Sequence, residues 1–300
     1  MSTARIAIVT SEVGIEEDAE LPLIVDALRA AGSAAEAVAW DADPAVWAGF
    51  DLAVIRSTWD YTDRLDAFLA WADTASRATR LWNPAPVVRW NSDKRYLRSL
   101  AEAGVPVVPT RFLAPGDRVR EEDFDTADTG LWADGMADGM VVKPTVSAGA
   151  RDTARYEPGR TADAVSHARM LLDRERAVMV QPYLRGVEAG ERALVFFSGS
   201  FSHAIRKQPL LTEPGVIDNN RVAHPGAAPY RPTEAELHTA RAALAAVPSP
   251  TVPLIARVDL ALNGHGDPVV MELELIEPNL FLDTTPDAVH RFTKAVIARS

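Results

Sequence analysis

The chain has 300 residues, and its 47% apolar content is that of an ordinary globular protein with room for two or three subdomains. It contains no cysteine, which excludes disulfides, a thiol nucleophile and a zinc–cysteine site. Asp and Glu (42) outnumber Lys and Arg (31), and the net charge of −11 argues against a nucleic-acid partner and favours a small-molecule ligand. We expect no membrane association and a cytoplasmic location, because no apolar stretch approaches the roughly 20 residues that cross a bilayer and no secretory signal is evident.

The first 87 residues are predicted to form an α/β domain. Residues 6–10 and 51–56 are apolar runs typical of buried parallel strands, and residues 21–31 and 65–78 are predicted helices. A polar and aromatic cluster, residues 57–61, follows the second strand at the end where ligands bind in open α/β sheets. The alternative is a structural loop whose aromatic side chains pack.

Two lysines stand where a phosphate would suit them. Lys94 is predicted in the first turn of a helix that begins at residue 91 and ends at Gly104, where the helix dipole disfavours a cation unless an anion compensates. Lys143 lies on an apolar strand and precedes a small-residue loop with Ser147 and Gly149, which can present N–H groups and a hydroxyl to phosphate oxygens. The alternatives are a surface lysine bonded to Asp93 and a plain hairpin loop.

The next segment carries weaker signals. Residues 121–139 hold seven acids and no base, which predicts a solvated loop or lid surface. The strand predicted over residues 177–184 is interrupted near its end, so its backbone groups can bind adenine, and Glu188 can accept hydrogen bonds from ribose hydroxyls. Taken singly, none of these patterns is specific.

Three acids are predicted to share one face of a hairpin. Glu272 and Glu274 are two residues apart in an apolar strand, so they point to the same side. If residues 255–262 pair with this strand across the turn at 263–267, Asp259 lies roughly opposite Glu272. Oxygen-only ligands suit magnesium or manganese. The alternative is a hairpin whose acids face water or pair with Arg257 and Lys294.

The order of these signals along residues 88–283 resembles the ATP-grasp superfamily. The resemblance implies an ATP-grasp fold of mixed α/β and α+β class, with an N-terminal α/β substrate domain (1–87), a nucleotide-binding subdomain with a lid (88–180) and a C-terminal catalytic subdomain with the metal site (181–300). It implies that ATP and two magnesium ions bind, with manganese as a substitute. Many members have Asn where this chain has Glu274, which keeps the oxygen chemistry and adds a negative charge.

The resemblance also implies roles for individual residues. In glutathione-synthetase-like members, two arginines face the transferred phosphate and the acyl group, and a guanidinium suits a developing oxyanion. The loop at residues 218–221 is expected to add substrate contacts, with a surface loop as the alternative. The implied residues are Arg192 and Arg206 for catalysis; Lys94, Lys143, Ser147, Gly149, Gln181, Tyr183, Leu184 and Glu188 for ATP; Asp259, Glu272 and Glu274 for metal; and Arg56, Ser57, Thr58, Asp60, Asn219 and Arg221 for substrate.

The implied reaction is ATP-dependent activation of a small carboxylate as an acyl phosphate, followed by attack of an amine-type nitrogen. The substrate is expected to be an amino-acid derivative, and no general base is identified. Ring closure to D-cycloserine in antibiotic biosynthesis fits the length of the chain, although no motif singles it out. The alternatives are a small-molecule phosphotransferase with the same nucleotide site and an ATP-binding sensor module. A homodimer is expected for a soluble enzyme of this kind.

Overall fold

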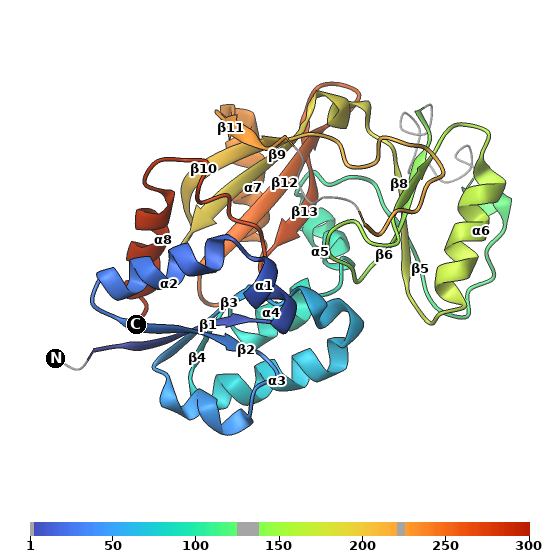
Figure 1. Ribbon diagram of the computed structural model, residues 1–300. Coiled ribbons are helices and arrows are strands. Elements are labelled where there is room, and N and C mark those ends of the chain that lie inside the picture. Colours follow the sequence, from blue (N-terminus) through green and yellow to red (C-terminus); the bar gives the residue numbers. More distant parts are fainter. Residues whose placement is uncertain (1–2, 125–137, 221–225) are drawn as a thin grey trace.

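The computed structural model describes residues 3–124, 138–220 and 226–300, which form three β-sheets with helices packed against them (Figure 1). Arg221 and most of the acidic stretch predicted at 121–139 lie outside these ranges. No helix in the described ranges is long and apolar enough to cross a membrane.

The N-terminal sheet is parallel, with strand order β2-β1-β3-β4. Its elements are β1 (Arg5–Thr10), α1 (Glu12–Glu17), α2 (Glu20–Ala30), β2 (Ala34–Ala39), η1 (Pro44–Gly49), β3 (Leu52–Ser57), η2 (Trp59–Asp63), α3 (Leu65–Ala78) and β4 (Arg80–Trp82). Successive side chains of β1 pack in different apolar clusters, because the side chains of a strand point alternately to its two faces. Ile6 and Ile8 pack with α2 and with the C-terminal helix α8 (Ala288–Ile297), whereas Ala7 and Val9 pack with α3. Helices therefore cover both faces of this sheet.

A second, antiparallel sheet, with strand order β5-β8-β6-β7, lies in the segment predicted to contain the lid, and the name lid subdomain is used for it below. Its elements are β5 (Arg111–Leu113), η3 (Glu121–Phe124), β6 (Met140–Pro144), β7 (Ala154–Tyr156), α6 (Thr161–Leu172) and β8 (Val178–Pro182). One apolar cluster joins α6 to these strands through Val142, Ala168 and Val180. Lys143 on β6 and Gln181 on β8 alternate with these residues and therefore point to the other face of the sheet.

The third sheet, here called the central sheet, is antiparallel with strand order β11-β10-β9-β12-β13. Its elements are η5 (Arg185–Ala189), β9 (Glu191–Phe197), β10 (Ser200–Lys207), β11 (Ala228–Tyr230), α7 (Glu234–Ala245), β12 (Ile255–Leu262) and β13 (Pro268–Glu274), and the short helices α4 (Ala85–Asn91) and α5 (Tyr96–Glu102) precede the lid. Leu194, Phe196 and Val258 pack against α7 on one face. The opposite face carries the charged residues of the site.

Most of the predicted elements are present, and one is wrong. The helix predicted over 65–78 coincides with α3, and the predicted hairpin is confirmed, since Asp259 pairs with Glu272. The helix predicted from residue 91 to Gly104 is wrong at its start: α4 ends at Asn91, and α5 begins only at Tyr96. Lys94 lies in the turn between them, so the helix dipole does not explain its position. The turn exists because the Asn91 amide is bonded to the backbone of Leu273 and Leu275.

Candidate functional site

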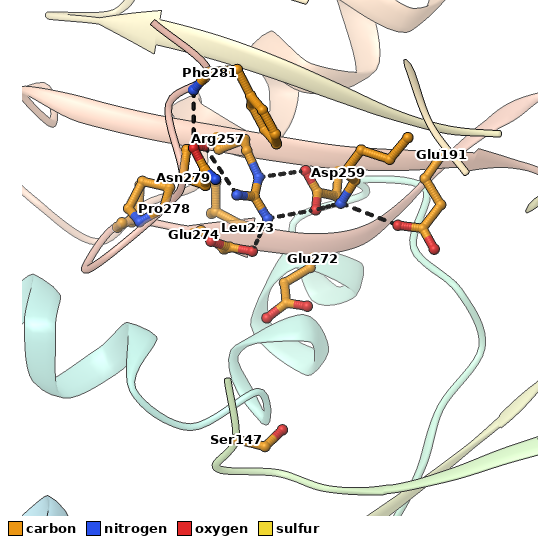
Figure 2. A network of polar contacts seen from close by, with 12 residues as sticks. Ser147, Glu191, Arg257, Asp259, Glu272, Leu273, Glu274, Pro278, Asn279 and Phe281 are labelled. Atoms are coloured by element: carbon orange, nitrogen blue, oxygen red, sulfur yellow. Dashed lines mark hydrogen bonds and ion pairs between the residues drawn. The ribbon is translucent and has the colours of Figure 1, made fainter. Parts of the chain in front are cut away.

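Charged residues gather on the face of the central sheet that lies away from α7. The pairing of β12 with β13 sets Asp259 beside Glu272 and Arg257 beside Glu274. Because directly opposed residues of an antiparallel pair point to the same side, all four share this face. Figure 2 shows Glu272 between the Arg257–Asp259 pair and Ser147 of the lid subdomain.

Protein cations balance the carboxylates of this face. The Arg257 guanidinium donates to both oxygens of Asp259, at 2.8 and 2.9 Å, and also to Glu274. The Lys207 ammonium lies 2.6 Å from Asp259 and 3.2 Å from Glu191. Arg257, Asp259 and Lys207 are buried, so these pairs are largely shielded from water. The alternative of acids paired with Arg257 is therefore realised, while the acids remain clustered.

The local charges move the carboxyl pKa values apart. Burial opposes ionisation of Asp259, but Arg257 and Lys207 outweigh it and hold its pKa well below the usual range. Burial likewise opposes ionisation of Glu272, yet Lys94 and Lys143 lower its pKa. For Glu274, burial and the neighbouring acids outweigh Arg257 and raise the pKa to about 7. The face thus keeps two ionised carboxylates next to one that titrates near neutrality.

Lys94 joins the central sheet to the lid subdomain. Its ammonium donates to the Ser147 carbonyl at 2.5 Å and lies 3.2 Å from Glu272. Lys143, on β6, faces the same carboxylate, and burial together with the nearby Lys94 lowers its pKa. Within the described ranges, the Lys143 ammonium has no hydrogen-bond or ion-pair partner. A partly buried cation of this kind is suited to bind an anion such as a phosphate.

The small-residue loop after β6 is held in a tight conformation. Gly149, Ala150 and Asp152 have φ angles of 62°, 58° and 52°, and a Cβ added at Gly149 would meet nothing within 4 Å. The Asp152 carboxylate pairs with Arg176, and its backbone N–H donates to Asn219 at 2.8 Å. Asn219, predicted to contact substrate, is thus placed against this loop.

The predicted adenosine contacts lie at the end of β8 and in the turn after it. Gln181 donates to Thr110 at 2.8 Å, and the Arg155 guanidinium lies 4.7 Å from the centre of the Tyr183 ring. Leu184 precedes η5, in which Glu188 is exposed. Glu188 also lines a cavity of about 380 Å³ together with Arg206 and Lys207. The structure therefore brings these residues to one edge of the charged face.

The two arginines predicted for catalysis occupy strand positions that alternate with those of the charged face, although the exposed Arg206 also lines the cavity shared by Glu188 and Lys207. Arg192 is buried, donates to the carbonyls of Gly186 and Gly190, and pairs with Glu236 of α7 at 3.4 Å. Arg206 is paired with Arg192 in the sheet and therefore points to the same side. The residues that alternate with them, Glu191 and Lys207, face the carboxylates instead. Lys207 and Arg257, rather than the two predicted arginines, are the cations that contact Asp259 on the charged face.

The predicted substrate cluster of the N-terminal domain is largely engaged in structural contacts. Arg56 is 1% exposed and binds Asp18, Glu20 and the Pro278 carbonyl. The Ser57 hydroxyl bonds Thr10 at 2.8 Å. The Arg56 contacts link the sheet to the segment after β13 and bury its guanidinium. Asp60 is engaged as well, since it accepts from Trp40 at 2.9 Å, whereas the buried Thr58 hydroxyl has no hydrogen-bond partner among the described residues.

The acids suit a magnesium ion by chemistry. Asp259, Glu272 and Glu274 offer only oxygen atoms from one face, which is the ligand type that magnesium prefers. In the described parts of the chain, however, no three acidic or histidine side chains converge closely enough to hold an ion. The reason is that each carboxylate is drawn to Lys94, Lys207 or Arg257.

Sequence reasoning named Arg257 only in the alternative in which it pairs with the acids, and it missed Lys207. Arg257 shares the face of Asp259 because it precedes Asp259 by two residues on the same strand. Lys207 follows Arg206 directly, and only the register of β10 against β9 shows which of the two faces the acids.

Comparisons with known proteins identify relatives of this chain. Residues 6–83 match the family described as D-cycloserine synthetase DcsG, N-terminal domain. The chain is 36% identical over 303 residues to the cycloserine biosynthesis protein DcsG of Streptomyces lavendulae, covering 98% of each protein. The crystal structure of D-cycloserine synthetase DcsG superposes with a TM-score of 0.87 at 35% identity, covering 98% of this chain and 99% of that one.

A more distant relative shares the fold alone. The D-alanine–D-alanine ligase of Bacillus anthracis, solved in complex with ATP, gives a TM-score of 0.67 at 14% identity, covering 99% of this chain and 97% of that one. With the identity to DcsG over nearly the whole chain, the ATP-grasp fold expected from the sequence is confirmed. The chain belongs to the D-cycloserine synthetase family of ATP-dependent, ATP-grasp ligases.

Proposed function

We propose that this protein closes the ring of D-cycloserine, using ATP to join a carboxyl group to a nitrogen within one molecule. The single observation that carries this proposal is the 36% identity to DcsG over 98% of both chains. In D-cycloserine an amide bond links the carboxyl carbon to a nitrogen borne on the side-chain oxygen. The substrate class is therefore a D-serine derivative with a nitrogen on that oxygen.

The reaction has two bond-exchange steps. A substrate carboxylate oxygen attacks the terminal phosphorus of ATP, and the bond to ADP breaks, which gives an acyl phosphate. The side-chain nitrogen then attacks the acyl carbon, the C–N bond forms, and inorganic phosphate leaves. Lys207 and Arg257, on the charged face, are suited to stabilise the negative oxygens of both steps. They replace Arg192 and Arg206 in this role.

The nucleotide is proposed to lie between the lid subdomain and the central sheet. Lys94, Lys143 and Ser147 bind its phosphates, and Gly149 allows the loop backbone to approach them. Gln181, Tyr183, Leu184 and Glu188 bind the adenosine. Asp259, Glu272 and Glu274 would hold two magnesium ions, or manganese, which neutralise phosphate oxygens. Support comes from Lys94, which contacts both Ser147 and Glu272 and so joins the two halves of this site.

The test is turnover of purified protein with magnesium, ATP and D-serine derivatives, followed by ADP release and by mass spectrometry of the product. We expect D-cycloserine and ADP in equal amounts with the wild type, and a loss of at least about 100-fold in kcat for Glu272→Gln, with an unchanged circular-dichroism spectrum. A phosphorylated small molecule in place of the ring would indicate a phosphotransferase. An absence of turnover with every derivative would favour the sensor module.

A further inference from the structure

Glu277 lies where the end of β13 meets the carboxyl edge of the N-terminal sheet. The residue before it, Ile276, is buried in the same apolar cluster as Val9 and Ile55 of that sheet. The residue after it, Pro278, accepts a hydrogen bond from Arg56 at the end of β3. Both neighbours are therefore fixed to the edge at which open α/β sheets bind their ligands.

The Glu277 carboxyl lies beside a residue of the N-terminal domain. Tyr61, in η2, is buried, and its hydroxyl is close enough to this carboxyl to influence its pKa. Glu277 itself is only partly buried, so it is not sealed within the core. Within the described ranges, no lysine, arginine or histidine lies within 4.0 Å of it. A carboxyl group is thus positioned at a ligand-binding edge without a protein cation beside it.

This lack of a cation distinguishes Glu277 from the other acids of the charged face. Glu191, Asp259, Glu272 and Glu274 each lie within 4.0 Å of a lysine or arginine. Removal of Glu277 from water, together with the negative charge of Glu274, raises its pKa to about 8. Lys94 lowers this pKa but does not outweigh these effects, so a bound cation close to the carboxyl would offset them further.

The charges around Glu277 are complementary to those of an amino acid. Arg257 donates to the Asn279 carbonyl at 3.1 Å, so its guanidinium is anchored to the same short segment as Glu277. Arg257 is a cation suited to a carboxyl or acyl-phosphate group, and Glu277 offers the opposite charge. We propose that Glu277 binds the α-ammonium group of the substrate and that Tyr61 positions its carboxylate for this contact. This inference rests on the proposed function, because it requires an amino-acid substrate.

The test compares the D-serine derivative with an analogue in which hydrogen replaces the α-amino group. We expect the wild type to prefer the amino substrate by about 100-fold in kcat/KM, since a site built for a charged group rejects a ligand that lacks it. Glu277→Gln should lose most of this preference, chiefly through a higher KM for the amino substrate. Glu277→Asp, which keeps the charge, should retain part of it, and Tyr61→Phe should weaken it several-fold.

Two controls separate ammonium binding from other roles. Binding of a non-hydrolysable ATP analogue with magnesium should be equal in wild type and Glu277→Gln, and Glu102→Gln, at the exposed end of α5, should behave as wild type throughout. Equal losses on both substrates, or recovery of Glu277→Gln by excess magnesium, would overturn the inference alone. A wild type that forms no ring product from any derivative would overturn the proposed function and the inference with it.

Discussion

At the scale of single residues, the charged face is organised by which cation each acid contacts. Asp259 touches both Arg257 and Lys207, and its pKa is lowered; Glu274 touches Arg257 but lies among acids, and its pKa is raised to about 7. Lys143 is the cation of this group without a direct partner in the described residues. Because its ammonium is free, replacement of Lys143 tests the proposed nucleotide site directly.

Lys143→Ala is expected to weaken nucleotide binding by about 10- to 150-fold, because a partly buried phosphate contact of a charged donor is worth roughly 1.5–3 kcal/mol. The measurement is the Kd of a non-hydrolysable ATP analogue by calorimetry. Lys294→Ala, an exposed lysine on α8, is the matched control and should bind as the wild type does. Equal affinity of all three proteins would contradict the role of Lys143.

His167 gives a prediction about pH. It is buried on α6, neither ring nitrogen has a hydrogen-bond partner within the described part of the chain, and burial lowers its pKa to about 4. The unfolded chain therefore binds a proton at this residue below about pH 6.5 while the folded one does not, so its contribution to stability falls as the pH drops from 6.5 to 4.

The measurement is urea unfolding of wild type and His167→Phe across this pH range. A phenylalanine side chain has room to extend into the cavity of about 410 Å³ that His167 lines, and it has no group that titrates. We expect the wild type to lose up to about 3 kcal/mol more than the variant between pH 6.5 and 4. Parallel stability curves for the two proteins would show that His167 is not the group responsible.

At the scale of elements, the loop after β6 is the one whose conformation depends on distant contacts. Arg176 binds the Asp152 carboxylate and donates to the Val146 carbonyl at 2.8 Å, so it holds both sides of the loop. Asn219 adds two hydrogen bonds to Asp152. A loop fixed before the nucleotide arrives loses less conformational entropy on binding.

Arg176→Ala is accordingly expected to raise the KM for ATP by about five- to tenfold with a smaller effect on kcat. Limited proteolysis should cut the variant faster within residues 145–153. Arg174→Ala, an exposed neighbour, provides the control, since it should match the wild type in both assays. A variant with unchanged KM and an uncut loop would show that Arg176 does not preorganise this segment.

Patterns within one strand could be predicted from the sequence, whereas relations between strands could not. Alternation within β12 and β13 placed Asp259, Glu272 and Glu274 on one face, and the pairing of the hairpin followed from its turn. The orientation of Arg192 and Arg206 depends on the register of β9 and β10, which no local pattern specifies. The same holds for Lys94, whose surroundings are set by an asparagine bonded to a strand about 180 residues away.

At the scale of the whole molecule, the N-terminal and C-terminal parts are tied together. Arg56 and Glu20 bind the backbone of the segment after β13, and α8 packs beside α2 in one apolar cluster (Figure 1). The division at residues 87 and 180 stays a prediction; β8 extends to Pro182, and the last helix packs on the first domain. The expected homodimer likewise stays a prediction, which sedimentation of the purified protein would check.

The central claim is that this ligase activates the substrate carboxylate as an acyl phosphate before the ring closes. The most direct measurement uses a D-serine derivative whose carboxyl oxygens are ¹⁸O-labelled, with mass analysis of the inorganic phosphate released. We predict that one labelled oxygen passes into each phosphate formed, because the acyl C–O bond breaks when nitrogen attacks. Ring product accompanied by unlabelled phosphate would contradict the account.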